Sequence, residues 1–191
     1  MDNQLKEIAQ IAGDFKLLKR SGWVFHKVKN PESVADHSWG LTFLAMMYAP
    51  KHLDKLKCLE LAIIHDLAEI EVGDITPRDG VSSIEKNKLE MLAMEKIVNR
   101  INTPLTQVLE LFQELEEQKT EESQFIKQLD KIEVVLQAYY YVSQGFMEPD
   151  VYQEFYNTSK NKIHLPYLQK LFSQLVSNYQ DILITPLKKD F

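Results

Sequence analysis

The stretch from Leu59 to Pro77, LELAIIHDLAEIEVGDITP, sets the interpretation of the rest of the chain. Its apolar residues recur at the i, i+3, i+4 spacing of an α-helix, which predicts that most of the stretch is one helix with a core-facing stripe. That stripe consists of Leu59, Ala62, Ile63, Asp66 and Ile70. A carboxylate on a buried helix face must be paired or neutralised, because burying it alone costs several kcal/mol.

Two further polar residues flank this carboxylate on the predicted helix. His65 and Glu69 lie on either side of Asp66, and Ala62 lies beside Glu69. A bound cation would compensate the buried charge, and the small side chain of Ala62 leaves room for one. The alternative is a hydrogen-bonded His–Asp pair at a helix surface. The periodicity of this helix alone leaves both interpretations open.

Length and composition are those of an ordinary globular protein. The chain has 191 residues, of which 45% are hydrophobic and 26% are charged, and it contains only 6 glycines and 7 prolines. So few residues that break regular structure, together with the absence of strand-like alternation, favour an all-α fold. We expect residues 1–191 to form a single domain.

Charge and cysteine usage exclude several classes of protein. The net charge of −6 argues against binding a nucleic-acid polymer through a broad basic surface. The negative net charge is still compatible with a small anionic substrate if a metal ion and a few nearby cationic side chains bind it. The single cysteine, Cys58, excludes an internal disulfide and fits a reducing compartment. We expect a cytoplasmic protein without a membrane span, because no apolar run is long enough for a signal peptide or a membrane helix.

Helical spacing extends over most of the remaining chain. The first predicted helix would bury Leu5 and Ile8, and another near the middle would bury Ile84. Ser33 is a good helix N-cap, and Thr120 is another. Loops are predicted at 20–32 and 78–83. Helices are predicted at 4–19, 33–50, 84–100, 104–118, 121–144 and 164–179.

A second histidine faces the core on the helix that begins at Ser33. His37 follows Val34 by three residues and precedes Leu41 by four, so it lies in the apolar stripe. A lone inward histidine is usually a satisfied core residue. Two inward histidines on consecutive helices, one of them next to Asp66, favour a metal site.

Five short motifs, taken together, resemble a known family. They are RSGW (20–23), PESVADHSWG (31–40), HDLAEIEVGDITP (65–77), the pair Lys86/Glu90, and LDKIEVVLQA (129–138). In this order they resemble the HD-domain metal-dependent phosphohydrolases, in particular the 5′-deoxynucleotidase branch. The resemblance covers about residues 15–145, and residues 146–191 would be a C-terminal helical extension of the same HD-domain helical bundle.

The resemblance implies a bound divalent metal ion of the Mn, Co, Zn, Fe or Mg type. Its ligands would be His37, His65, Asp66 and Asp130. Helical periodicity alone places Asp130 off the buried stripe. Two-metal members of the superfamily carry additional ligands, usually histidines, between the third and the fourth of these positions. This chain has no histidine there, so we expect one metal ion.

The resemblance also implies roles for residues around the metal. Glu69 and Asp74 would be the catalytic residues that move protons and position the attacking water. Glu69 could instead orient a ligand histidine, and Asp74 could simply form the turn after Gly73.

The same resemblance assigns substrate contacts. Arg20, Trp23 and Lys86 would bind the nucleotide, and the tryptophan would disfavour a 2′-hydroxyl. In some relatives the arginine and the tryptophan are adjacent, whereas Ser21 and Gly22 separate them here. From the residues alone, an aromatic side chain and an arginine in a loop are equally typical of a core edge.

The expected activity is hydrolysis of deoxyribonucleoside 5′-monophosphates by attack of a metal-bound water. One alternative is an HD phosphohydrolase acting on another small phosphate ester or nucleotide, and another is a metal-stabilised binding module without turnover. Relatives suggest a homodimer. Aromatic side chains of the later helices permit one but could equally be core: Tyr139, Tyr140, Tyr141, Phe146 and Phe155.

Overall fold

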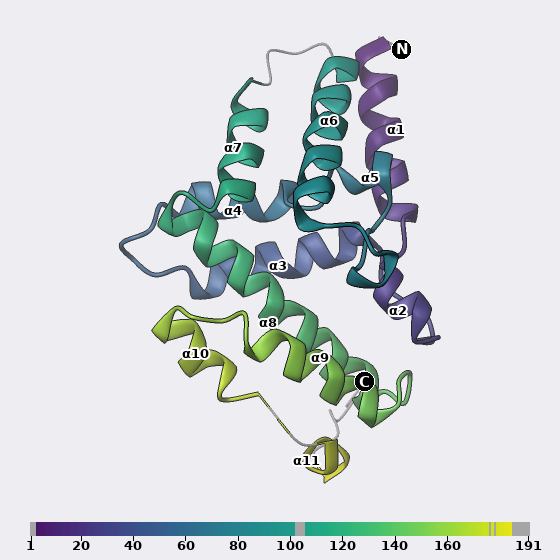
Figure 1. Cartoon of the computed structure of the whole chain (residues 1–191), viewed down its shortest axis with the longest axis vertical. Coiled ribbons are helices and arrows are strands. Elements are labelled where there is room, and N and C mark those ends of the chain that lie inside the picture. The colour runs from purple at the N-terminus through teal and green to yellow at the C-terminus, as the bar shows by residue number, and fades with distance from the viewer. Residues whose placement is uncertain (1–2, 102–105, 176, 178, 185–191) are drawn as a thin grey trace.

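The computed structural model of the chain describes residues 3–101, 106–175, 177 and 179–184. Regular structure in these residues is helical, apart from an isolated antiparallel bridge between Lys19 and Ser33. This confirms the predicted all-α class. The helices, labelled in Figure 1, are α1 (Asn3–Leu17), α2 (Ser21–Phe25), α3 (Val34–Tyr48), α4 (Lys55–Ile64), α5 (Glu69–Val72), the 3-10 turn η1 (Pro77–Asp79), α6 (Ser83–Ile101), α7 (Thr106–Glu117), α8 (Glu121–Ser143), α9 (Pro149–Lys160), α10 (Pro166–Phe172) and α11 (Tyr179–Ile184).

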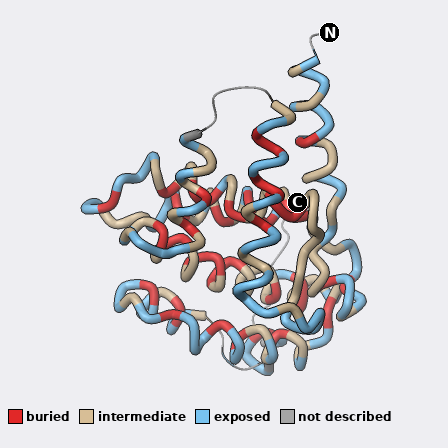
Figure 2. The backbone as a smooth tube through the Cα atoms, turned by 45° about the horizontal axis from the view of Figure 1, so that its top comes forward, coloured by how far each residue is buried: buried red, intermediate tan, exposed pale blue. Residues whose placement is uncertain are grey.

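The long helix α8 runs through the middle of the bundle, with α3 and α4 packed against it (Figure 1). Buried residues lie on the inner faces of the helices (Figure 2). The larger of two hydrophobic clusters joins α3, α4, α8 and the later helices α9 and α10. The smaller cluster joins α1, α6 and α7, and its buried members are Ile11, Ala68, Ala93, Met94, Ile97 and Phe112.

Capping side chains fix where two of these helices begin, as the sequence predicts. Ser33 accepts a hydrogen bond from the Asp36 backbone N–H, and the Asp36 carboxylate accepts one from the Ser33 N–H. Thr120 likewise accepts from the Ser123 N–H at the start of α8. Such reciprocal caps satisfy N–H groups that lack partners within the helix. They set the registers of α3 and α8, which both contribute to the site.

The central stretch is not one helix, contrary to the prediction. Helix α4 ends at Ile64, and the chain then tightens into turns with i to i−3 hydrogen bonds, such as Glu69 N to Asp66 O at 3.1 Å. Tightening toward three residues per turn brings side chains three apart onto one side. Asp66 and Glu69 therefore face the same way, while Ile63 points outward and is 48% exposed.

Several local expectations also differ from the structure. Residues 20–32 include the short helix α2, helix α9 was not predicted, and only Pro166–Phe172 of the predicted helix at 164–179 belongs to α10. Leu5, Ile8 and Ile84 are exposed, contrary to the prediction; Leu5 and Ile84 lie in the first turns of α1 and α6, and the buried residue of α1 is Ile11. The predicted helix start at Thr103-Pro104 lies outside the described residues.

The aromatic residues of the later helices are mainly core. Tyr141 is buried, whereas Tyr139, Phe146 and Phe155 are half-buried and pack on the larger cluster.

Among the described residues, no helix is long and apolar enough to cross a bilayer.

Candidate metal centre

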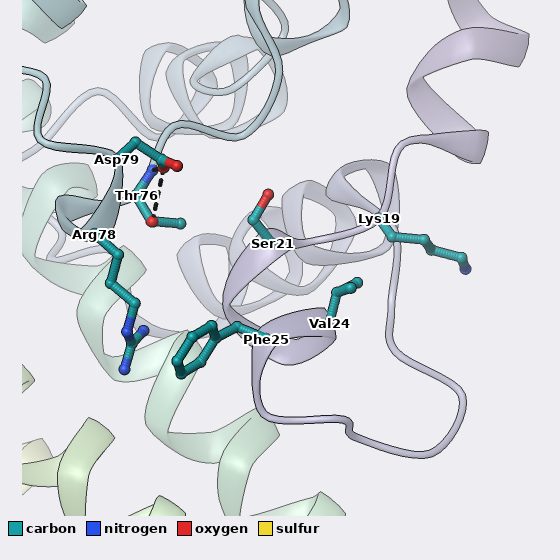
Figure 3. A pocket seen from close by; sticks show the side chains of 7 residues that line it. All are labelled: Lys19, Ser21, Val24, Phe25, Thr76, Arg78 and Asp79. Atoms are coloured by element: carbon teal, nitrogen blue, oxygen red, sulfur yellow. Dashed lines mark hydrogen bonds between the residues drawn. The ribbon is translucent and has the colours of Figure 1, made fainter.

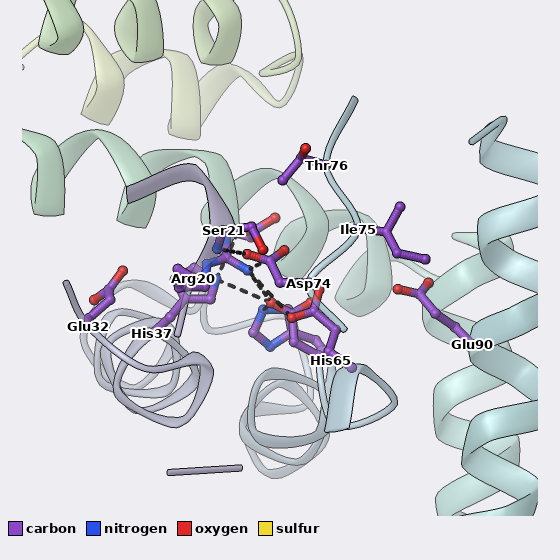
Figure 4. A network of polar contacts seen from close by, with 12 residues as sticks. Arg20, Ser21, Glu32, His37, His65, Asp74, Ile75, Thr76 and Glu90 are labelled. Carbon is purple, nitrogen blue, oxygen red and sulfur yellow. Dashed lines mark hydrogen bonds and ion pairs between the residues drawn. The ribbon is translucent and has the colours of Figure 1, made fainter. Parts of the chain in front are cut away.

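Three of the predicted metal ligands come from different elements and meet at one point. His37 lies on α3, His65 directly follows α4, and Asp130 lies on α8. One ligand atom from each residue lies within 4.8 Å of the other two. Figure 4 shows both histidines gathered with Arg20 and Asp74 at the centre of a polar network. The packing of α3 and α4 against α8 thus assembles this site.

The atoms that face this point lack hydrogen-bond partners. His37 Nε2, His65 Nε2, Asp130 Oδ1 and Glu69 Oε2 are all buried and unpaired within the part of the chain that the structure describes. His37 Nε2 approaches Asp130 Oδ1 to 3.1 Å, but without the alignment of a hydrogen bond. Unpaired buried polar atoms are rare because each costs about 1–3 kcal/mol. Two imidazole nitrogens and a carboxylate oxygen fit a divalent cation.

Each of these ligands is also held from its far side. His37 Nδ1 lies 2.5 Å from Glu133 Oε2, and His65 Nδ1 lies 2.8 Å from the Ala62 carbonyl oxygen. Carboxylate and carbonyl oxygens accept hydrogen bonds, so Nδ1–H donates outward in both rings and Nε2 is the ring nitrogen that faces the metal site. Lys131 Nζ donates to Asp130 Oδ2 at 2.6 Å. Such outer partners orient metal ligands in many proteins.

The fourth predicted ligand lies at the same place. Asp66 Oδ2 is 3.0 Å from His65 Nε2 and 3.7 Å from His37 Nε2, and it accepts a hydrogen bond of 2.8 Å from Arg20 Nη1. Burial alone would raise the pKa of Asp66, but its contacts with His65, Arg20 and His37 hold that pKa well below its usual range. Asp66 is therefore a carboxylate that can bind a cation.

Glu69 has the properties of a proton acceptor. Its side chain is 1% exposed, with Oε2 at 4.0 Å from Arg20 Nη1 and Oε1 at 3.9 Å from Lys86 Nζ. Burial and the negative charge of Asp66 raise its pKa well above the usual value for glutamate. A carboxyl group with a raised pKa beside a cation site suits general base chemistry.

Asp74 is held by the first residue of α2. Its Oδ2 accepts a 2.6 Å hydrogen bond from the Ser21 backbone N–H, and its Oδ1 lies 3.8 Å from Arg20 Nη1. Gly73, with φ of 80°, reverses the chain immediately before it.

Lys86 lies at the edge of the same network. Its Nζ donates to the Ile75 carbonyl oxygen at 3.0 Å and lies 3.4 Å from Glu90 Oε1. Despite burial, the charges of Glu90 and Glu69 raise its pKa. The ammonium therefore neutralises carboxylates around the site. Its predicted contact with substrate stays a prediction.

Trp23 is a core residue. It is 2% exposed, and its ring packs between Tyr141 and Phe155 at centroid distances of 5.3 and 4.4 Å. The indole N–H donates to Glu32 Oε1 at 2.8 Å. Burial, together with the charge of Glu133, raises the pKa of Glu32 to about 7. The position of Trp23 thus agrees with the alternative that this aromatic side chain belongs to the core. The predicted role of Trp23 in sugar selection stays a prediction.

Sequence reasoning did not single out three residues that support the ligands. Glu133 and Lys131 hold His37 and Asp130, and Gly40 makes space for Glu133. A Cβ at position 40 would lie 2.5 Å from Glu133 Oε1. The only sequence signal was that Glu133 follows Asp130 by three residues on one helix.

The fold and this centre define an HD domain. The HD-domain family model matches residues 12–171, and the chain belongs to this family of metal-dependent phosphohydrolases. It is similar to proteins named 5′-deoxynucleotidase HDDC2. The Dictyostelium discoideum protein is 38% identical over 93% of this chain and 99% of its own length, and the Xenopus laevis protein is 37% identical over 90% and 85%.

Solved structures agree with this assignment. A conserved hypothetical protein from Pyrococcus furiosus superposes with a TM-score of 0.73 at 29% identity and covers 95% of this chain and 99% of its own. The yeast HD domain-containing protein YGK1 superposes with a TM-score of 0.65 at 20% identity, which supports the fold alone.

Proposed function

We propose that the chain hydrolyses deoxyribonucleoside 5′-monophosphates to deoxynucleosides and inorganic phosphate. The observation that carries the proposal is the convergence of unpaired buried His37 Nε2, His65 Nε2 and Asp130 Oδ1 next to Glu69. Relatives that are 37–38% identical over most of the chain are named 5′-deoxynucleotidases, which supports the choice of substrate.

One divalent ion would be held by His37, His65, Asp66 and Asp130. Their nitrogen and oxygen donors suit Mn²⁺, Co²⁺, Zn²⁺, Fe²⁺ or Mg²⁺, and the absence of histidine between the last two ligands supports a single ion. When bound, such an ion lowers the pKa of water and neutralises charge on phosphoryl oxygens.

The protein's own groups then move the protons. Glu69 takes a proton from the attacking water. The water oxygen bonds to phosphorus while the bond between phosphorus and the 5′ oxygen of the substrate breaks. Asp74, whose carboxylate is held by the Ser21 N–H, would return a proton to the leaving oxygen. Arg20 would bind the phosphate through its guanidinium. In the structure this group contacts the carboxylates of Asp66, Glu69 and Asp74.

Two further features remain proposals. A homodimer is supported by exposed apolar side chains along α3, where Trp39 stacks on Phe43 and Met46 and Met47 are also exposed. A cytoplasmic location is supported by the single buried cysteine, Cys58.

The test is phosphate release by metal-free protein to which each divalent ion is returned, with deoxy- and ribonucleoside 5′-monophosphates as substrates. We expect metal-dependent release that favours deoxy substrates. Glu69→Gln should lower kcat by roughly 10²–10⁴-fold, because it removes the proton acceptor while keeping the side-chain shape. Glu95→Gln, on the exposed face of α6, is the matched control and should retain full activity.

The outcomes separate the alternatives. Equal phosphate release from deoxyribose and ribose substrates would support the hydrolase activity but contradict selection against the 2′-hydroxyl. Release from other phosphate esters alone indicates a different substrate. Tight metal binding without any turnover, unchanged by Glu69→Gln, indicates the non-catalytic binding module.

A further inference from the structure

Asp74 lies on a short segment that is bounded by two glycines. Gly73 and Gly80 have φ values of 80° and 71°, in the region of backbone conformation that favours glycine. A Cβ at either position would meet nothing within 4 Å, so the backbone conformation, and not a lack of space, calls for glycine. Glycine leaves the backbone at both ends free to rotate. The position of residues 74–79 therefore depends on the contacts that hold this segment.

Apolar packing does little to hold the segment. None of the apolar residues of 74–79 is fully buried, and none belongs to either hydrophobic cluster. The hydrogen bonds between Thr76 and Asp79 are internal to the segment, as the dashed line in Figure 3 shows. Its first residues are joined to the rest of the protein by the polar contacts with Ser21 and Lys86. The η1 turn, in its second half, needs a contact of its own.

Arg78 supplies this contact, because it links η1 to two other elements. Its Nη2 donates to Glu154 Oε1 on α9 at 2.6 Å and to His26 Nε2, directly after α2, at 3.2 Å. Its guanidinium carbon lies 4.1 Å from the centroid of the Phe25 ring, and Figure 3 shows these two side chains next to each other. One side chain thus joins η1 to both α2 and α9.

The contact with α2 is made across open space. A cavity of about 410 Å³ separates α2 from η1, and Figure 3 shows Ser21 and Phe25 on one side of it and Thr76 and Arg78 on the other. Close packing of side chains does not fix the distance between these two elements. Contacts that cross the gap, such as those of Arg78 with Phe25 and His26, must therefore fix it.

The anchor of Arg78 on α9 is itself well supported. Glu154 precedes Phe155, whose ring packs on the buried Trp23 at a centroid distance of 4.4 Å. Helix α9 also packs along α8, the helix that carries Asp130. The helix that carries a predicted metal ligand thus supports, through α9, the segment that carries Asp74.

The ion pair is too exposed to contribute much to the stability of the fold. The side chains of Arg78 and Glu154 are 40% and 51% exposed, and water weakens the attraction between charges at such positions. The main effect of the pair is therefore expected on the position of a segment that few other contacts hold.

We propose that Arg78 is a positioning residue, which holds residues 74–79 against α2 and α9 and so keeps Asp74 at the metal centre. This proposal rests on the proposed function, in which Asp74 returns a proton to the leaving oxygen. It adds the contact that fixes Asp74 from outside the centre. Loss of this contact should slow the reaction and leave metal binding unchanged, because the predicted metal ligands lie on other elements.

The test exchanges the two charges. Arg78→Glu and Glu154→Arg each place like charges side by side, and the double variant restores an ion pair in the opposite direction. We would measure kcat and KM for dAMP with added Mn²⁺, and hydrogen exchange of the backbone amides of residues 74–82 in the metal-free proteins. The matched control is Lys119→Glu, which reverses one charge of an exposed ion pair with Glu117 outside the segment.

We expect each single variant to lower kcat by roughly 3- to 10-fold, because an exposed attraction is replaced by repulsion. The amides of the segment should exchange faster in both, since the segment opens more often. The double variant should return to within about 2-fold of the wild-type kcat, as expected when the two charges act on each other. KM and Tm should change little, and Lys119→Glu should match wild type.

Three results would overturn the positioning role. They are an unchanged kcat in both single variants, faster exchange without a lower kcat, and a loss that the double variant does not recover. A wild-type protein that hydrolyses no nucleotide would instead overturn the proposed function. The exchange measurement needs no turnover, so it would still decide whether Arg78 holds the segment.

Discussion

At the scale of single residues, Glu133 determines how His37 presents its ring. The carboxylate lies 2.5 Å from Nδ1, so that nitrogen carries the proton and Nε2 faces the metal site. The pair is buried, with His37 0% and Glu133 5% exposed. A buried carboxylate also increases the basicity of the imidazole that it contacts, which strengthens a metal–nitrogen bond.

Glu133→Ala is therefore expected to weaken metal binding by roughly 10- to 100-fold, the usual effect of losing such a partner. Glu133→Gln should lose less, because its amide oxygen still accepts from Nδ1–H. Competition with a chromogenic chelator measures this affinity without any reaction. Glu95→Ala is the control, and equal affinity in Glu133→Ala and wild type would contradict the role.

At the scale of elements, the contact between α3 and α8 depends on a glycine. Gly40 lies one turn after His37, opposite Glu133, and a Cβ there would lie 2.5 Å from Oε1 and 3.3 Å from the carboxyl carbon. Real Cβ atoms do not approach so closely, so any larger residue would displace the carboxylate from His37. A glycine inside a helix is less favourable than alanine by about 1 kcal/mol, and here the lack of space for a Cβ outweighs this difference.

Gly40→Ala should consequently lower the free energy of unfolding by about 1–3 kcal/mol, through overpacking against Glu133. In a Glu133→Ala background the clash is absent, and the same substitution should stabilise by up to about 1 kcal/mol, because alanine is the better helix former. Urea unfolding of metal-free proteins completes this double-mutant cycle. An equal loss in both backgrounds would show that Gly40 is needed for another reason.

At the scale of the whole molecule, the metal centre joins elements that are far apart in the sequence. His37, His65 and Asp130 come from α3, the end of α4 and α8, and they leave buried donor atoms unpaired without an ion. An ion that binds these groups only in the folded state stabilises that state by mass action. The prediction that residues 1–191 form one domain stays a prediction.

Removing the metal should lower the stability of the fold. At a free ion concentration one hundred times Kd, the bound ion contributes about 2.7 kcal/mol, so the Tm should rise with added Mn²⁺ or Co²⁺ and fall with chelator. In Asp130→Asn this dependence should be much weaker, since one charged ligand is lost. A wild-type Tm that does not respond to any divalent ion would contradict a resident metal.

The sequence predicted most of the helices, because their apolar residues repeat at helical spacing and their caps are local. It failed between Ile64 and Val72, where helical spacing continues but the backbone tightens to i to i−3 bonds. This tightening is coupled to contacts from elsewhere, such as Arg20 with Asp66. A pattern that counts residues along one helix cannot include such contacts.

For the site, His37, His65 and Asp66 could be selected from inward-facing positions, whereas Asp130 came only from the family resemblance. Asp130 is 7% exposed because α8 runs through the middle of the bundle and is covered on several sides, which a single apolar stripe does not reveal. Glu133 is buried by the same packing, and its contact with His37 spans 96 positions of the chain.

The helical class, the caps and the residue types able to bind a divalent ion could be predicted from the residues alone, since these features depend on neighbours within a few positions. The packing of the helices was needed to show that Trp23 belongs to the core, that Glu133 and Gly40 support His37, and that a cavity opens beside Ser21. These depend on which helices pack together and at what distance, and that is settled by burial of apolar surface throughout the chain.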